Sequence, residues 1–130
     1  MNKIKAAIIA TTIAMGGLAA AAPAQAASTC QIMGAPYECD SIASVRLPNG
    51  SIQWFVVGTD HAVWTNWTQV EGGLHGWQSL GGIVQGPISI WGKSADGWSF
   101  FIGATGTDGK PWDRQRADDG TWTPWSPWSS

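Results

Sequence analysis

The stretch Gly58-Thr59-Asp60-His61-Ala62-Val63-Trp64 occurs twice in this chain. Its second copy is Gly106-Thr107-Asp108-Gly109-Lys110-Pro111-Trp112, in which the Gly, Thr, Asp and Trp positions are all displaced by 48 residues. Short apolar runs and Gly/Asp turns surround both copies. A repeat of this length, built from short strands, is typical of one blade of a β-propeller. The sequence therefore predicts two tandem units of β-sheet.

Turn residues divide each unit into four expected strands. Asn49-Gly50 is the clearest turn, because this pair tolerates the positive φ that a tight hairpin requires. The expected strands are residues 41–47, 51–58, 62–69 and 77–80 in the first unit, and 86–91, 98–102, 110–116 and 121–128 in the second. After the N-terminal apolar run, no stretch keeps helical periodicity over more than two turns. The prediction is an all-β fold of two four-stranded antiparallel blades, residues 41–82 and 83–130.

Three details of the second unit are expected to differ from the first. If Trp122 corresponds to Trp77, the offset between the two units falls from 48 to 45 residues there. The loop before Trp122 would then be shorter by three residues. Residues 102–106 hold one residue more than residues 55–58, which predicts a β-bulge. Pro124 and Pro127 lack N–H donors, so the last strand should lie at a sheet edge.

The first residues have the form of a signal peptide. Lys3 and Lys5 precede an apolar run over residues 6–22, and Ala24-Gln25-Ala26 has the small-x-small form that signal peptidase cleaves. We expect cleavage after Ala26, a secreted protein and no membrane insertion afterwards. The alternative, a retained membrane anchor, is weakened by the small alanines and glycines that dominate the run.

The charge of the remaining chain argues against a nucleic-acid partner. Loss of Lys3 and Lys5 leaves five basic residues against nine acidic ones. The three arginines, Arg46, Arg114 and Arg116, form no basic stripe of the kind that displaces phosphate counterions.

Cys30 and Cys39 are the only cysteines, and both follow the expected cleavage site. In an oxidising compartment they predict a disulfide, which would stabilise an irregular N-terminal arm, residues 27–40. The sequence has none of the usual His/Cys pairings of a metal site, so neither a metal nor another cofactor is expected.

The repeated Gly-Thr-Asp-x-x-x-Trp, followed by Gly-Trp-x-x-Leu-Gly-Gly, resembles the repeat of bacterial propeller lectins of the PLL type, which are related in architecture to tectonin-like and fucose-binding lectins. The resemblance covers residues 41–128. The residues that carry it are Gly58, Thr59, Asp60, Trp64, Gly76, Trp77, Leu80, Gly81, Gly82, Pro87, Gly106, Thr107, Asp108, Gly109, Trp112 and Trp122. It implies four-stranded blades in a ring, with glycans, fucose among them, bound between neighbouring blades. The chain departs from that pattern because it has two blades and its second copy lacks the closing Leu-Gly-Gly.

Two blades leave open sheet edges, and this predicts that the propeller is completed by a cyclic homo-oligomer. The rival arrangement is a compact monomer in which the cysteine arm caps one edge.

All ten tryptophans lie after residue 50, and indole faces suit the apolar side of a sugar ring. Amide and guanidinium groups suit its hydroxyls. The predicted sugar-binding residues are Trp64, Asn66, Trp67, Trp77, Trp112, Arg114, Arg116 and Trp122. They predict a secreted carbohydrate-binding protein with Trp-lined clefts between blades. The alternative is a secreted, non-catalytic protein-interaction or inhibitor module that uses the Trp-rich blade faces. An enzyme is not expected, because the sequence has no nucleophile elbow and its aspartates fall in turns.

Overall fold

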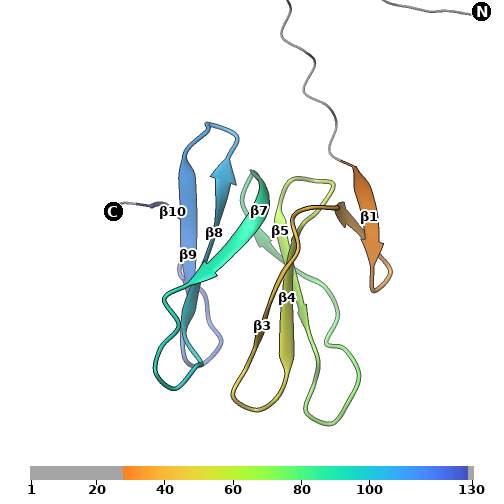
Figure 1. Ribbon diagram of the computed structural model, residues 1–130, viewed down its shortest axis with the longest axis vertical. Coiled ribbons are helices and arrows are strands. Elements are labelled where there is room, and N and C mark those ends of the chain that lie inside the picture. The colour runs from red at the N-terminus through yellow and green to blue at the C-terminus, as the bar shows by residue number, and fades with distance from the viewer. Residues whose placement is uncertain (1–27, 129–130) are drawn as a thin grey trace, which may run out of the picture.

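A computed structural model describes residues 28–128, and Figure 1 shows two β-sheets beside a short hairpin. The first sheet, blade 1, has the strand order β3-β4-β5-β6, and the second, blade 2, has the order β7-β8-β9-β10. Every strand pair is antiparallel, and the described part contains no helix. The predicted all-β fold with two four-stranded antiparallel sheets is confirmed. The predicted signal peptide, residues 1–26, lies outside the described residues.

The strands are short and separated by tight turns. Blade 1 consists of β3 (Ala43–Arg46), β4 (Ile52–Val57), β5 (Val63–Trp67) and β6 (Gln78–Gly81). Blade 2 consists of β7 (Val84–Trp91), β8 (Phe100–Gly106), β9 (Pro111–Arg116) and β10 (Ser126–Pro127). The hairpin consists of β1 (Thr29–Ile32) and β2 (Ala35–Glu38), closed by the predicted disulfide between Cys30 and Cys39. The expectation of an irregular arm is therefore wrong, because these residues pair with one another in register.

The offset of 48 residues holds through the whole second half of each blade. An isolated bridge joins Thr68 to Leu74 in blade 1, and the matching bridge in blade 2 joins Arg116 to Trp122. Trp122 is thus the counterpart of Leu74, and the counterpart of Trp77 is Trp125. The predicted loss of three loop residues is wrong, because it matched two tryptophans by identity, whereas strand pairing determines which positions correspond.

The predicted bulge in residues 102–106 is also misplaced. β8 pairs with β9 without any register shift. The irregularity lies on its other side, where residues 86–88 of β7 stand opposite Ala104 alone. Pro87 in that segment has no N–H to give to a sheet ladder, which favours an interruption there.

The last strand is much shorter than predicted. Its only regular part is Ser126–Pro127, which pairs with β9 at the edge of blade 2, and Trp122 adds one isolated bridge to Arg116. Pro124 and Pro127 cannot donate hydrogen bonds, so regular pairing over the expected residues 121–128 is impossible.

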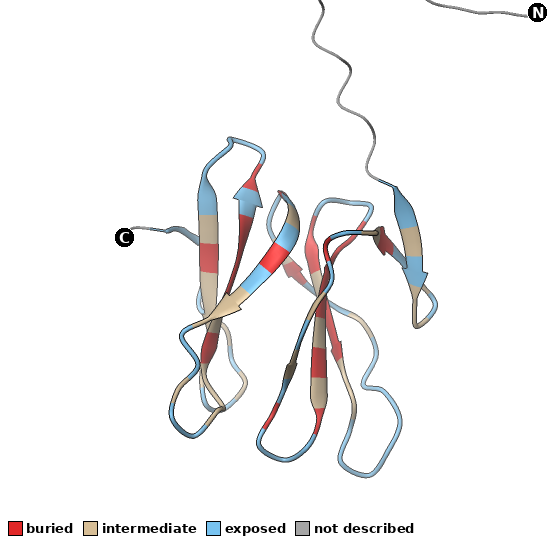
Figure 2. Cartoon of the chain, in the orientation of Figure 1, coloured by how far each residue is buried: buried red, intermediate tan, exposed pale blue. Residues whose placement is uncertain are grey.

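The core is the seam between the two blades. Phe55 of β4 meets Phe100 of β8 edge-to-face, with ring centroids 6.0 Å apart, and both are fully buried. Val57, Val63 and Ile102 complete the centre of this seam, which also contains Val84 and Ile88 of β7. Figure 2 shows buried residues on the central strands of both sheets. Burial of these side chains, at about 1.5–3 kcal/mol each, stabilises the contact between the blades.

The blades stack front to back. Blade 1 turns Phe55 and Val57 into the seam, whereas blade 2 turns Ile102 and Ala104 into it. The 48-residue offset makes Gly103 the counterpart of Phe55, and Gly103 lies on the opposite side of its sheet. Each blade therefore presents a different face to the seam, which is the stacking mode that a propeller repeats around its ring.

The hairpin lies against blade 1 on the side away from blade 2 (Figure 1). Tyr37 of β2 is buried and forms a bridge with Gly58 at the end of β4. Ser41 follows the hairpin and is also buried; its hydroxyl donates to the Glu38 carbonyl and accepts from the Val57 N–H.

Candidate functional site

The repeated turns at residues 58–64 and 106–112, here called the Asp–Trp turns, are structural units. Asp60 accepts hydrogen bonds from the Ala62 backbone N–H and from the Trp64 indole N–H, each at 3.0 Å. Asp108 does the same for Lys110 and Trp112, at 3.0 and 3.2 Å. The Lys110 N–H is the main reason why the pKa of Asp108 lies below the ordinary aspartate value. The carboxylate thus holds the turn and orients the indole.

The glycine of each Asp–Trp turn is required for close approach. A Cβ placed on Gly106 would lie 2.6 Å from Asp108 Oδ1 and 2.8 Å from Trp112 Cδ1. On Gly58 the corresponding distances, to Asp60 and Trp64, are both 2.8 Å. Glycine, aspartate and tryptophan therefore form one interlocked contact in each repeat.

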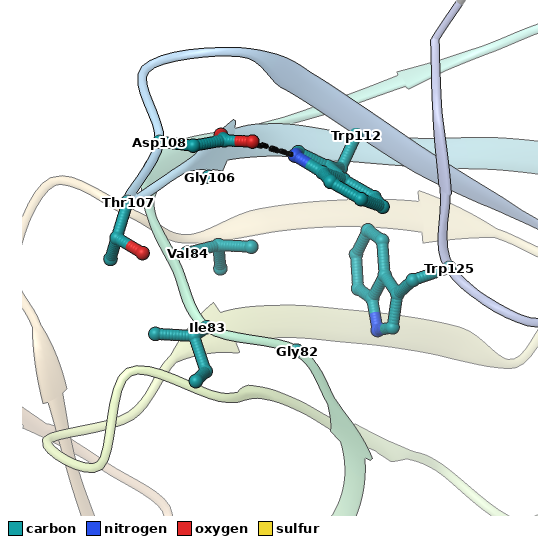
Figure 3. A pocket seen from close by; sticks show the side chains of 8 residues that line it. All are labelled: Gly82, Ile83, Val84, Gly106, Thr107, Asp108, Trp112 and Trp125. Atoms are coloured by element: carbon teal, nitrogen blue, oxygen red, sulfur yellow. Dashed lines mark hydrogen bonds between the residues drawn. The ribbon is translucent and has the colours of Figure 1, made fainter.

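Trp112 and Trp125 line a cavity of about 280 Å³ together with Gly82 and Ile83 (Figure 3). Figure 3 shows the two indoles close together and the hydrogen bond from Trp112 to Asp108. Trp125 donates its indole N–H to the Leu80 carbonyl, at 2.8 Å. The Asp108 carboxylate and the indole N–H groups of Trp112 and Trp125 are thus paired within the protein.

Blade 1 has a matching cavity of about 260 Å³ under its own Asp–Trp turn. Trp64 and Trp77 take the places of Trp112 and Trp125, and Ala35 and Pro36 of the hairpin take the places of Gly82 and Ile83.

A different cleft, here called the seam cleft, opens elsewhere along the contact between the blades. Its volume is about 310 Å³. Blade 1 and the loop after β3 provide one wall, and β9 with the loops of blade 2 provides the other. Three tryptophans line it with six polar side chains: Trp67, Trp98, Trp122, Asn49, Ser51, Gln53, Gln78, Arg116 and Asp119.

Gln53 is the least accessible polar side chain of the seam cleft, with 3% of its surface exposed. Its Nε2 donates to Thr65 Oγ1 at 3.0 Å, whereas its Oε1 is buried and has no hydrogen-bond partner among residues 28–128. A buried polar atom without a partner costs about 1–3 kcal/mol. Because Gln53 lines the seam cleft, a ligand donor that reaches this oxygen would give it the partner that it lacks.

Arg116 and Asp119 give the cleft both signs of charge. The Arg116 guanidinium lies 5.8 Å from the Trp98 ring centre, and its Nη1 donates to the carbonyls of Trp98 and Ala117. Burial lowers the Arg116 pKa from its ordinary, very high value. Asp119 accepts from the hydroxyl and the N–H of Thr121, and these bonds hold its pKa below the ordinary aspartate value.

The aromatic rings of the cleft are held by their neighbours. Trp67 stacks on His75 with ring centres 3.9 Å apart and an angle of 15° between the planes. Trp122 meets Phe55 and Phe100 edge-to-face, at 5.8 and 6.1 Å. The indoles are therefore oriented before any ligand arrives.

Of the eight residues predicted from the sequence, the seam cleft brings together Trp67, Arg116 and Trp122. Trp64, Trp77 and Trp112 lie in the two cavities under the Asp–Trp turns.

Asn66 and Arg114, the two remaining predicted residues, bind backbone. The buried Asn66 Oδ1 accepts from the N–H groups of Trp67 and Gly76, at 2.8 and 2.9 Å. Arg114 donates to the carbonyls of Thr123 and Leu80, and it thereby links the two blades.

The remaining cleft residues were not predicted. Trp98 is expected to begin the strand of residues 98–102 but lies in the loop before β8, and Asp119 falls in a predicted turn. Gln53 carried a usable signal, because it is one polar residue inside the apolar run of residues 52–57.

Within residues 28–128 there is no cluster of three or more His, Cys, Asp or Glu side chains that could hold a metal ion. The same residues include no helix with the length and apolar character needed to cross a membrane. No protein-family model matches the chain, and a search of curated proteins finds no match either.

Proposed function

We propose that the protein is a secreted carbohydrate-binding protein whose site is the seam cleft. The single observation that carries this proposal is the buried, unpartnered Oε1 of Gln53 in a cleft lined by three indoles. A sugar hydroxyl is a donor that could satisfy this oxygen.

The rest of the lining suits the same ligand class. Indole faces of Trp67, Trp98 and Trp122 can contact the apolar C–H side of a pyranose. The amide of Gln78, together with the charged Arg116 and Asp119, supplies donors and acceptors for hydroxyls on its polar side. A volume of about 310 Å³ lies at the lower limit of small-molecule sites, which favours one sugar ring over a long chain.

The acidic groups of the cleft support a binding role without catalysis. Among the described residues that line the cleft, Asp119 is the only carboxylate. Its pKa is lowered by the hydrogen bonds from Thr121, which favours the ionised form over a proton donor. Glycoside hydrolysis generally requires a pair of carboxyl groups across the scissile bond.

Secretion is supported by the disulfide between Cys30 and Cys39, because such bonds persist in oxidising compartments. The signal-peptide pattern of residues 1–26 leads to the same proposal. The resemblance of the repeat to PLL-type lectins makes fucose the first sugar to test. Both walls of the seam cleft come from one chain, so sugar binding does not depend on the predicted homo-oligomer.

The test is a glycan array followed by titration of tryptophan fluorescence with the best saccharide. Gln53→Met keeps the length of the side chain and removes the acceptor. We expect it to weaken binding about tenfold or more, which corresponds to about 1.4 kcal/mol.

The matched control is Gln115→Met, because Gln115 bonds Ser99 at 3.1 Å and does not line the seam cleft. This variant should bind like the wild type. The proposal fails if the folded wild-type protein binds no saccharide, or if Gln53→Met binds as tightly as the control. If the protein binds no saccharide but captures a protein partner, and Gln53→Met still captures it, the alternative of a protein-interaction module would be favoured.

A further inference from the structure

The hairpin makes the same contacts with blade 1 that the end of blade 1 makes with blade 2. The Trp125 indole N–H donates to the Leu80 carbonyl at 2.8 Å. Its counterpart Trp77 donates to the Met33 carbonyl at 3.4 Å. Met33, in the turn of the hairpin, therefore occupies the position that Leu80 of β6 occupies in the seam.

The neighbouring residues extend this correspondence. Tyr37 pairs with Gly58, and Val84 pairs with the counterpart Gly106. Gly34 precedes Tyr37 by three residues, and Gly81 precedes Val84 by the same number. Gly34 therefore corresponds to Gly81 in this alignment.

The cavities under the Asp–Trp turns agree with this alignment. Ala35 and Pro36 line one of them, and Gly82 and Ile83 line the other (Figure 3). Residues 33–37 thus reproduce residues 80–84, the exit from the last strand of a preceding blade.

Several contacts hold the hairpin in this place. The disulfide joins Cys30 to Cys39, and the Glu38 carboxylate lies 3.3 Å from His61 Nδ1. Asn66 donates to the Met33 sulfur at 3.8 Å, at the position where Arg114 reaches Leu80 in the seam. Val56 and Asn66, on the outer face of blade 1, are each only 1% exposed.

We propose that the outer face of blade 1 is a docking surface for blade 2 of a second copy, and that the hairpin occupies this surface as a substitute blade edge. The seam inside the chain is the template, because it joins these same two types of face. None of residues 28–128 covers the outer face of blade 2, where Trp91, Thr105 and Trp128 surround a cavity of about 380 Å³.

The hairpin and blade 2 of a second copy cannot occupy the outer face of blade 1 at the same time. Trp128 is the counterpart of Leu80 through the 48-residue offset, and its N–H bonds the Pro111 carbonyl next to β10. A second copy stacked as in the seam would therefore place its Trp128 where Met33 lies. The seated hairpin stops head-to-tail stacking, and its displacement opens the route to the predicted homo-oligomer.

The test compares the mass of the full chain in solution with that of a variant with an opened hairpin. Gly34 has φ +79°, so Gly34→Val strains the hairpin turn, and Cys30→Ser with Cys39→Ser removes its crosslink. By sedimentation velocity, we expect the wild type to keep a constant mass as its concentration rises. The average mass of the triple variant should at least double.

A second substitution separates stacking from misfolding. Thr105 is exposed on the outer face of blade 2, where Thr105→Arg would place a charge against the docking surface. Thr105→Arg should return the triple variant to the wild-type mass, and Thr105→Ser should not.

Three results would overturn the proposal. The first is a folded triple variant of unchanged mass, and the second is growth that Thr105→Arg leaves intact. The third is a wild-type assembly of stacked copies in which the disulfide-closed hairpin remains seated. None of these results depends on whether the seam cleft binds sugar.

Discussion

The Asp–Trp turns and the seam cleft differ in how the two repeats use them. At the turns the repeats agree, since Asp60 with Trp64 and Asp108 with Trp112 make the same hydrogen bonds. At the cleft they disagree: the counterpart of Trp122 is Leu74, and the counterpart of Arg116 is Thr68. The repeated motif therefore builds the sheet ends, and the side chains that differ between repeats supply the proposed binding chemistry.

The polar groups show the same division. Asp108 and the indole N–H groups of Trp112 and Trp125 all bond within the protein. In the cleft, one oxygen of Gln53 stays without a partner among the described residues. A motif found by its repetition can thus mark stability, whereas a ligand site is marked by a polar group that the fold leaves unpaired.

The largest expected effect comes from a substitution that disrupts one Asp–Trp turn and leaves the seam cleft unchanged. Gly106→Ala places a Cβ within 2.8 Å of Asp108 and Trp112, so these two hydrogen-bonded side chains must shift. Overpacking of this kind costs about 1–3 kcal/mol of unfolding free energy. Urea denaturation measures it, with the exposed Thr105→Ala as the control, which should remain within about 0.5 kcal/mol of the wild type. A wild-type midpoint for Gly106→Ala would show that the interlocked turn is dispensable.

Two arginines on β9 allow a finer comparison between a stabilising contact and the seam cleft. Arg114 links the blades through Leu80 and stacks over Trp122 and Trp125, whereas Arg116 lines the seam cleft. Arg114→Met should lose roughly 1–2 kcal/mol of stability and keep sugar affinity, because charged hydrogen bonds contribute about that amount. Arg116→Met should weaken sugar binding about tenfold. Parallel urea and fluorescence titrations compare the pair, and an interchange of the two effects would contradict the division.

The contribution of the Asp–Trp turn at Asp108 to the stability of the protein should fall at acid pH. The folded-state pKa of Asp108 is lowered, so its contribution is fully present above the unfolded value, about 3.9, and is lost as the pH falls through the folded value. Thermal unfolding between pH 5 and about pH 2 should show the wild type losing stability below about pH 4. Asp108→Asn should be less stable at neutral pH and show a shallower decline. Equal slopes for the two proteins would contradict this assignment.

The fold was largely predictable because repetition and turn residues are local signals. Both sheets follow from the copies at residues 58–64 and 106–112 and from turns such as Asn49-Gly50. The hairpin was missed because its segment has few periodic apolar positions and lies outside the repeat, which marks the equally short β3 and β6. Trp122 was aligned incorrectly because identity suggested Trp77, whereas bridge pairing makes it equivalent to Leu74.

The cleft was only partly predictable because its walls come from distant segments. Nothing local in the sequence places Trp98 and Trp67 in one cleft, since they line it together only when the blades stack front to back. Arg114 and Arg116 look equivalent on an alternating strand, yet one bonds a carbonyl of blade 1 and the other faces the cleft. Composition led to the proposed ligand class, and only the stacking of the blades brings three of the eight predicted residues into one cleft.

The smallest expected change in stability gives the sharpest test of the contrast between the Asp–Trp turns and the seam cleft. Gln53→Met should leave the free energy of unfolding nearly unchanged or slightly higher. Its one side-chain hydrogen bond is lost, but Thr65 Oγ1 still donates to the Trp54 carbonyl, and the substitution removes the unpartnered Oε1. Replacement of a poorly paired polar group by an apolar one of similar shape is typically close to neutral. Urea denaturation without sugar measures this, beside Thr65→Val, which removes the acceptor of Gln53 and should destabilise the protein. A large loss of stability in Gln53→Met would mean that this amide serves the fold, and the seam cleft would then lose its strongest sign of a ligand.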